Sequence, residues 1–141
     1  MINSRRIEDL HPRVQVMARA HLAACEAAGI DLLITSTYRD HESQEALYAQ
    51  GRTGPGRKVT NARAGQSFHN YRLAYDVVPL RNGKPVWGTT GVDGDLWLRV
   101  GELGEAAGLE WAGRWTRFRE YPHFQFTEGN PLSYFQSGQQ I

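Results

Sequence analysis

The chain has 141 residues, which suits one domain of common size and is too short for two domains with separate cores. Its composition, 40% hydrophobic and 22% charged, is typical of a folded domain and excludes an extensively disordered chain. The formal net charge of +1 gives no general reason to expect nucleic-acid binding, and the single cysteine, Cys25, excludes an internal disulfide. We therefore expect one domain over residues 1–141 and no nucleic-acid partner.

The N-terminal residues do not resemble a secretory signal. Residues 1–10 are polar and charged and lack the apolar run of a secretory signal, and no stretch of about 18 apolar residues could span a membrane. We expect a protein that is made in the cytoplasm and forms no stable association with a membrane. A substrate outside the membrane would have to be reached with the help of another factor.

The first predicted element is an amphipathic helix over residues 12–28. It begins at a proline, which suits a helix start, and glycine follows its last residue. The apolar residues with helical spacing are Val14, Met17, Ala20, Ala24 and Ala28. Cys25 is expected in the core, and His21 at the surface or between helices.

A strand and a short helix are predicted next. The apolar, β-branched run 31–37 favours a strand, and Asp40 can cap a helix that ends near Gly51. Residues 51–66 contain four glycines and little apolar periodicity, which predicts an irregular loop. Its arginines and Lys58 could attract an anionic substrate, although a solvated loop explains them as well.

The second half predicts strands that pair through tight turns. Residues 73–79 alternate as a strand with Asp76 on one face, and Asn82-Gly83 is the strongest hairpin signal in the chain. A helix is expected over 94–107, followed by a strand over 122–126. The residues expected on the buried stripe of that helix are Leu96, Val100, Leu103 and Ala107. This order predicts an α+β fold with a mainly antiparallel sheet flanked by helices.

Two of the five histidines lie where a metal ion could be bound. His69 ends the glycine-rich loop seven residues before Asp76, and His123 lies on the last predicted strand. Catalytic zinc sites commonly use three ligands of the histidine and carboxylate types and leave a position for water. Glu120, three residues before His123, could serve as a general base beside such a site. A histidine satisfied at a sheet surface is the alternative for His123.

Two spaced motifs in this chain resemble signatures of the zinc D-Ala-D-Ala and L-alanyl-D-glutamate metallopeptidases. Residues 67–76, SFHNYRLAYD, are similar to S-x-H-x-x-G-x-A-x-D, and residues 115–124, WTRFREYPHF, are similar to W-x-x-F-x-[DE]-x-P-H-F. Residues 36–39 and 108–115 resemble two further family segments, S-x-[YF]-R and G-L-x-W-G-G-x-W. The resemblance spans residues 32–126 and implies a zinc DD-peptidase or hedgehog-like fold.

The resemblance also implies roles for individual residues. The Zn²⁺ ligands would be His69, Asp76 and His123, and Glu120 would be the general base. Arg39 would stabilise the developing oxyanion or anchor a substrate carboxylate, and Ser67 would contact the substrate near the metal. One departure is Arg72, which replaces the family glycine and makes the geometry between the first two ligands harder to predict. Another is an alanine at position 112, where glycine is common.

The implied activity is hydrolysis of the L-alanyl-D-glutamate bond of the peptidoglycan stem peptide. The short single-domain length is similar to that of phage endolysins, which wait in the host cytoplasm until a holin opens the membrane and gives access to the cell wall. We expect a monomer of this kind, acting against a Gram-negative wall. The alternatives are a bacterial wall-remodelling enzyme, a D-Ala-D-Ala carboxypeptidase or dipeptidase, and a non-catalytic wall-binding zinc module.

Overall fold

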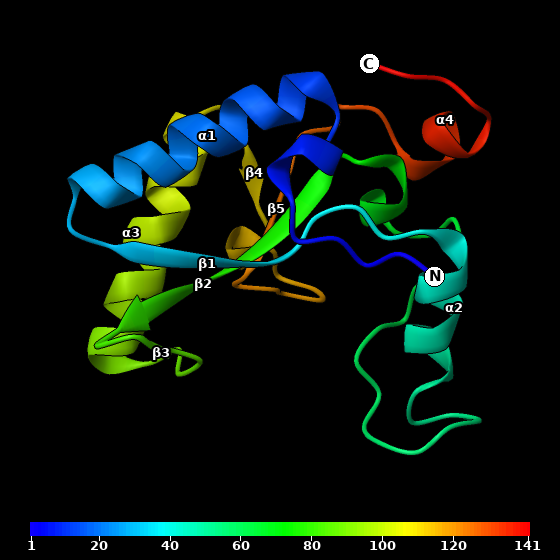
Figure 1. Ribbon diagram of the computed structural model, residues 1–141, viewed down its shortest axis with the longest axis horizontal. Coiled ribbons are helices and arrows are strands. Elements are labelled where there is room, and N and C mark those ends of the chain that lie inside the picture. Colours follow the sequence, from blue (N-terminus) through cyan, green and yellow to red (C-terminus); the bar gives the residue numbers. More distant parts are fainter.

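The computed structural model describes the whole chain, residues 1–141, and an antiparallel sheet lies at its centre (Figure 1). Four strands follow the spatial order β1-β2-β5-β4, and β3 pairs with the free end of β2. The strands are β1 (Asp31–Ser36), β2 (Ala74–Arg81), β3 (Lys84–Pro85), β4 (Glu110–Trp111) and β5 (His123–Gln125). The predicted α+β class and antiparallel sheet are confirmed.

Strand β2 is the central strand and carries Asp76. Its register with β5 places Asp76 directly opposite His123, and its register with β1 places Asp76 opposite Ser36. The second pairing depends on an irregularity between Ile34 and Ser36, which shifts the register by one residue. The sheet therefore brings residues from three distant parts of the sequence to one point.

Helices cover the sheet and extend beyond one of its ends. α1 (Pro12–Ala27) and α3 (Gly91–Ala106) pack against each other and against the sheet, while α2 (His41–Ala49) and α4 (Leu132–Gln136) lie at the opposite end from α3 (Figure 1). Three short 3₁₀ helices complete the fold: η1 (Ile7–Asp9), η2 (Phe68–Tyr71) and η3 (Ala112–Arg114). None of the helices combines the length and the hydrophobicity that a membrane span requires.

Local signals in the sequence correspond closely to the structure. The Asp40 carboxylate accepts a hydrogen bond of 2.8 Å from the Ser43 amide and caps α2. Asn82 and Gly83 both have positive φ, 54° and 76°, as the two-residue turn between β2 and β3 requires. Residues 51–66 form the irregular loop that was predicted.

The predicted buried stripe of α1 is wrong by part of a turn. Val14 and Cys25 are buried as predicted, but Ala20 and Ala28 are exposed, and the helix buries Ala18 and His21 in their place. His21 can be buried because its Nδ1 lies 2.7 Å from the Tyr75 hydroxyl and its Nε2 lies 2.9 Å from the Val100 carbonyl. Satisfying both ring nitrogens removes the cost that usually keeps histidine near the surface.

The stripe of α3 also differs from the prediction. The helix starts three residues early, and Leu96, Leu103 and Ala107 are only partly buried. Its buried face consists of Trp97, Val100, Gly101 and Gly104. A Cβ atom added to either glycine would lie within 2.4 Å of an aromatic ring, that of Trp111 or Phe124. The glycines are therefore the contact surface of α3 for β4 and β5.

Candidate metal centre

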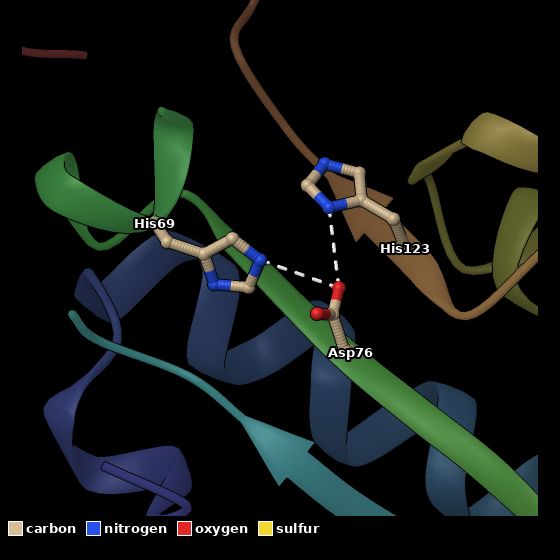
Figure 2. A group of neighbouring side chains, drawn as sticks. All are labelled: His69, Asp76 and His123. Atoms are coloured by element: carbon tan, nitrogen blue, oxygen red, sulfur yellow. Dashed lines mark hydrogen bonds and ion pairs between the residues drawn. The ribbon is translucent and has the colours of Figure 1, made fainter. Parts of the chain in front are cut away.

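Three side chains predicted to bind a metal converge at one point of the structure (Figure 2). His69 projects from η2, Asp76 from β2 and His123 from β5. Asp76 Oδ1 lies 3.2 Å from His69 Nε2 and 3.2 Å from His123 Nδ1, and the ligand atoms of the three residues all lie within 4.8 Å of one another. Both imidazoles are buried, whereas the carboxylate remains partly accessible.

The orientation of His69 is set by its neighbours in the chain and by Thr37, the residue after β1. The Ser67 hydroxyl caps η2 by accepting a hydrogen bond of 3.2 Å from the His69 amide. The ring donates from Nδ1 to the Thr37 carbonyl at 2.8 Å, since a carbonyl oxygen can only accept. In the neutral ring, the lone pair is then on Nε2, which faces Asp76.

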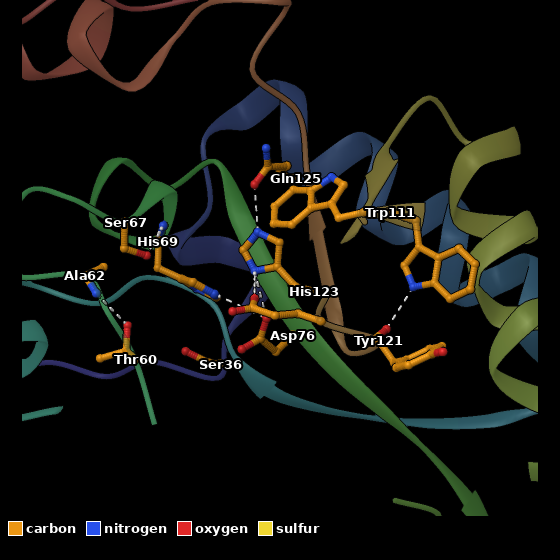
Figure 3. Close-up of polar contacts among 12 residues, drawn as sticks. Ser36, Thr60, Ala62, Ser67, His69, Asp76, Trp111, Tyr121, His123 and Gln125 are labelled. Atoms are coloured by element: carbon orange, nitrogen blue, oxygen red, sulfur yellow. Dashed lines mark hydrogen bonds and ion pairs between the residues drawn. The ribbon is translucent and has the colours of Figure 1, made fainter. Parts of the chain in front are cut away.

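His123 is held in the complementary way. Its Nε2 lies 2.7 Å from Gln125 Oε1 and donates to that oxygen, so the lone pair of the neutral ring is on Nδ1 (Figure 3). Nδ1 is the nitrogen that faces Asp76. The two histidines thus direct different ring nitrogens toward the same carboxylate oxygen.

The cluster fits a divalent cation. Two imidazole lone pairs and a carboxylate are all acceptors, and they repel one another unless a proton or a metal ion lies between them. Burial raises the pKa of Asp76, but the two histidines lower it by a larger amount. The pKa of Asp76 therefore lies well below its usual range. Burial lowers the pKa of His123, but Asp76, together with Glu120 and Gln125, raises it above its ordinary value. Two histidines and one carboxylate are a donor set that catalytic zinc sites use.

Glu120 lies beside the cluster on the loop that leads into β5. Its Oε2 is 3.5 Å from His123 Nδ1, and its side chain is 54% exposed. The Glu120 amide donates to the Ala112 carbonyl at 3.3 Å, which ties this loop to η3. The carboxylate is therefore close to the ligand atoms and also accessible to water, as a general base must be.

Arg39 approaches the cleft from the end of β1. Its guanidinium donates to Gln44 Oε1 at 2.9 Å and to Ser36 Oγ at 3.2 Å, while its buried Nε has no partner. Burial lowers the pKa of Arg39, and the charges of Asp76 and Glu120 only partly oppose this effect. The side chain is thus a partly buried cation with donor capacity left over.

A cleft of about 720 Å³ contains all six predicted site residues. They are Arg39, Ser67, His69, Asp76, Glu120 and His123. Beyond Glu120 the cleft joins a second hollow of about 670 Å³, whose lining includes Lys58, Phe118 and Arg119. We call these two spaces together the groove.

Sequence reasoning missed the residues that orient the predicted ligands. Gln125 was detectable, because it lies two residues after His123 on a strand and so shares its face. Thr37 acts through its main-chain carbonyl and Gln44 through a contact with Arg39, and neither contact has a local sequence signal.

Arg72 adopts the backbone conformation that glycine would have adopted. It ends η2 in the left-handed region, with φ 66° and ψ 24°. Its guanidinium lies 3.8 Å from the centre of the Tyr38 ring and donates to the Asp9 carbonyl at 2.8 Å. The tight turn between His69 and Asp76 is therefore kept despite the departure from the family motif.

Comparison with known proteins agrees with this geometry. The family described as D-alanyl-D-alanine carboxypeptidase matches residues 60–126, which include the three clustered residues and Glu120. The peptidoglycan L-alanyl-D-glutamate endopeptidase CwlK of Bacillus subtilis is 43% identical over 123 residues, which cover 83% of this chain and 73% of the relative. The chain belongs to the family of peptidoglycan metallopeptidases that includes CwlK. The predicted enzyme class is thereby confirmed.

Two more proteins resemble this peptidase. The L-alanyl-D-glutamate peptidase of a Listeria phage is 31% identical over 124 residues, which cover 85% of this chain but 39% of the phage protein. The crystal structure of the L-Ala D-Glu endopeptidase ChiX of Serratia marcescens has a TM-score of 0.64 at 19% sequence identity, with 89% of each chain covered. This structural likeness confirms the predicted fold.

Proposed function

We propose that this peptidase is a zinc-dependent endopeptidase that hydrolyses the L-alanyl-D-glutamate bond of peptidoglycan stem peptides. The observation that carries the proposal is the cluster of His69, Asp76 and His123 with the Glu120 carboxylate 3.5 Å from the last of these. The choice of bond is supported by the Bacillus and phage relatives, since both are named for L-alanyl-D-glutamate cleavage.

In the proposed reaction, His69, Asp76 and His123 would hold the zinc ion. A bound zinc ion is a Lewis acid that can polarise a carbonyl group and lower the pKa of water toward neutrality. Glu120 takes a proton from the attacking water at its carboxylate and then gives this proton to the departing amine. Arg39 offsets the negative charge that develops on the scissile carbonyl oxygen.

The shape of the groove supports an endopeptidase over a carboxypeptidase. An endopeptidase must receive substrate residues on both sides of the scissile bond, and the groove continues past Glu120 into the second hollow. Lys58 and Arg119 line that extension, and the groups that Arg119 bonds, the Trp115 carbonyl and the Tyr121 hydroxyl, are both uncharged. Stem peptides carry free carboxylates that these cations could attract.

Digestion of purified Gram-negative peptidoglycan tests the proposed bond. The zinc-loaded protein is compared with a chelated sample and with Glu120→Gln, and the products are identified by mass spectrometry. New amino-terminal glutamate that disappears in both controls is the expected result. Loss of terminal D-alanine would instead establish a carboxypeptidase, and wall binding without cleavage would establish a non-catalytic module.

We also propose that the enzyme acts as an endolysin, released to the wall when a holin opens the membrane. The phage relative supports this role, whereas the Bacillus relative supports wall remodelling in a bacterium. Expression in a Gram-negative host with and without a holin gene separates the two roles. Lysis that requires the holin is expected, and intact cells containing active enzyme and an open membrane would contradict the endolysin role.

The monomeric state stays a prediction.

A further inference from the structure

We infer that Gln125 and Glu110 form a positioning pair that keeps the proton of His123 on Nε2 and so leaves Nδ1 available to a metal ion. The inference rests on the proposed metal site, but it does not depend on which peptide bond is cleaved. Neither residue lies among the predicted ligands or the predicted base. Their effect on the metal is exerted through His123.

The first step is the contact between Gln125 and the imidazole. Gln125 Oε1 lies 2.7 Å from His123 Nε2, on the side of the ring away from Asp76 (Figure 3). Both side chains are buried, with 4% and 6% of the residue exposed. Water therefore has little access to replace this hydrogen bond, and its direction decides which nitrogen carries the proton.

The second step is what fixes the direction of that hydrogen bond. A glutamine amide can present either its oxygen or its NH₂ group, so Gln125 alone would not define the tautomer. Gln125 Nε2 donates to Glu110 Oε2 at 3.2 Å, and an ionised carboxylate can only accept. Because Glu110 takes the NH₂ end, the oxygen end has to face His123.

The third step is that Glu110 is itself held in place. Glu110 and Gln125 are directly opposite each other in the β4–β5 pair. Trp115 Nε1 donates to the same carboxylate oxygen at 3.0 Å, and the Trp115 ring lies 5.8 Å from that of His123. A chain of hydrogen bonds thus runs from Trp115 through Glu110 and Gln125 to the imidazole. Such outer contacts orient metal-binding histidines and increase their basicity.

The pair has a specific task because Asp76 acts in the opposite sense. Its Oδ1 lies 3.2 Å from His123 Nδ1 and would favour a proton on that nitrogen, where the proton blocks metal binding. Gln125 favours the proton on Nε2 instead. His69 needs no such pair, because its Nδ1 donates to the Thr37 main-chain carbonyl, which cannot flip like an amide.

Four proteins test the inference: wild type, Gln125→Leu, Glu110→Gln, and the double variant Glu110→Gln/Gln125→Glu. The double variant exchanges the two groups, so it conserves charge and again offers His123 an oxygen that can only accept. Zinc affinity is measured without substrate by competition with a chromophoric chelator. Ring ¹⁵N chemical shifts of the histidines, recorded with and without zinc, report the tautomer, and His69 serves as the internal reference.

We expect both single variants to lose roughly 10- to 100-fold in zinc affinity and the double variant to regain most of it. The ¹⁵N shifts of metal-free Glu110→Gln should show more proton on His123 Nδ1, with His69 unchanged. Unchanged affinity and shifts in the single variants would overturn the inference, as would a folded double variant that stays weak. If Gln125→Leu fails to fold, the other two variants still decide. Wild-type protein that binds no zinc would refute the metal site itself, whereas cleavage of a different bond would refute only the proposed substrate.

Discussion

The metal centre and the outer part of the groove are built in contrasting ways. His69 and His123 are buried, and each ring donates from one nitrogen to a fixed oxygen while its other nitrogen faces Asp76. Glu120, Lys58 and Arg119 lie on exposed loops, and Lys58 has no ion pair. Metal ligands need fixed donor positions, whereas groups that meet a substrate must be accessible to it. The fold thus places the metal-binding residues in its interior and the substrate-contacting residues on its surface.

The largest effect of a substitution is expected at the metal centre. Asp76→Ala removes the only carboxylate of the cluster and leaves two histidines that repel a cation whenever they are protonated. We expect loss of bound zinc and a fall in hydrolysis to the level of the chelated enzyme, measured by elemental analysis and by peptidoglycan digestion. Asp93→Ala, which breaks only the surface pair with Arg81, is the matched control. Stoichiometric zinc in Asp76→Ala would rule out this residue as a ligand.

Glu120→Gln should affect catalysis without affecting metal binding, because it removes the base and leaves the ligands in place. We expect kcat to fall by about 10²- to 10⁴-fold while the zinc content stays at the wild-type level. Glu128→Gln changes a carboxylate outside the groove and should leave the rate unaltered. A Glu120→Gln enzyme with a near wild-type rate would refute the assignment of the base.

The stability of the core next to the metal centre should depend on pH. His21 bonds to Tyr75 and packs against Phe124, the neighbours of Asp76 and His123 on β2 and β5. Burial lowers the pKa of His21 below its ordinary value of 6.5, and the bond to the Val100 carbonyl only partly opposes this. The unfolded chain therefore binds this proton more readily than the folded chain. The contribution of neutral His21 to the free energy of unfolding is complete at a pH above 6.5 and is lost as the pH falls below that value.

Urea unfolding of metal-free protein from about pH 8 to about pH 5 measures this effect. We expect the free energy of unfolding to fall below the ordinary pKa by up to about 1.4 kcal/mol per pH unit from His21 alone. His21→Gln keeps the ligands and removes this titration, so the difference between the two proteins isolates it. Parallel curves for both proteins would show that His21 does not contribute.

A smaller effect is expected at the outer end of the groove. Lys58→Gln removes one unpaired cation, and an exposed charge pair contributes about 0.2–1 kcal/mol, which corresponds to a rise in KM of at most about fivefold. The zinc content and kcat should not change, and the difference from wild type should shrink at high ionic strength. Lys84→Gln, on β3 outside the groove, is the control. Equal KM values for the two variants would exclude Lys58 from substrate binding.

Features of the fold that depend on neighbouring residues in the sequence were predictable. The Asp40 cap and the Asn82-Gly83 turn are short-range signals. The candidate ligands were also accessible, because an alternating strand places His123 and Asp76 on defined faces and the motifs name the residue types. The resemblance implied that they share one metal ion, but their common location depends on the pairing of β2 with β5, which only the structure shows.

Features that depend on contacts between distant elements were not predictable from local patterns. Gly101 and Gly104 would ordinarily weaken a helix, yet they form its buried face, because Trp111 and Phe124 fill the space that side chains would occupy. His21 is a core residue only because Tyr75 and Val100 satisfy its ring. Apolar periodicity has no information about such partners, so it misplaced both helical stripes.

Arg72→Gly is expected to have the smallest effect and tests how strongly η2 depends on side-chain contacts. Glycine relieves a left-handed conformation that costs an ordinary residue about 1–2 kcal/mol, but it loses about 0.5–1 kcal/mol through chain entropy and a similar amount through the contact with Tyr38. The net change in the free energy of unfolding should lie within about 1 kcal/mol.

Arg72→Ala is the matched variant, because it keeps the backbone strain and loses the same contacts. It should be less stable than Arg72→Gly by about 1 kcal/mol in urea unfolding, and both variants should bind zinc as wild type does. If Arg72→Gly instead binds zinc weakly, the contacts of the guanidinium with Tyr38 and Asp9 hold His69 in place. The metal centre would then depend on an exposed side chain, and its separation from the surface would be incomplete.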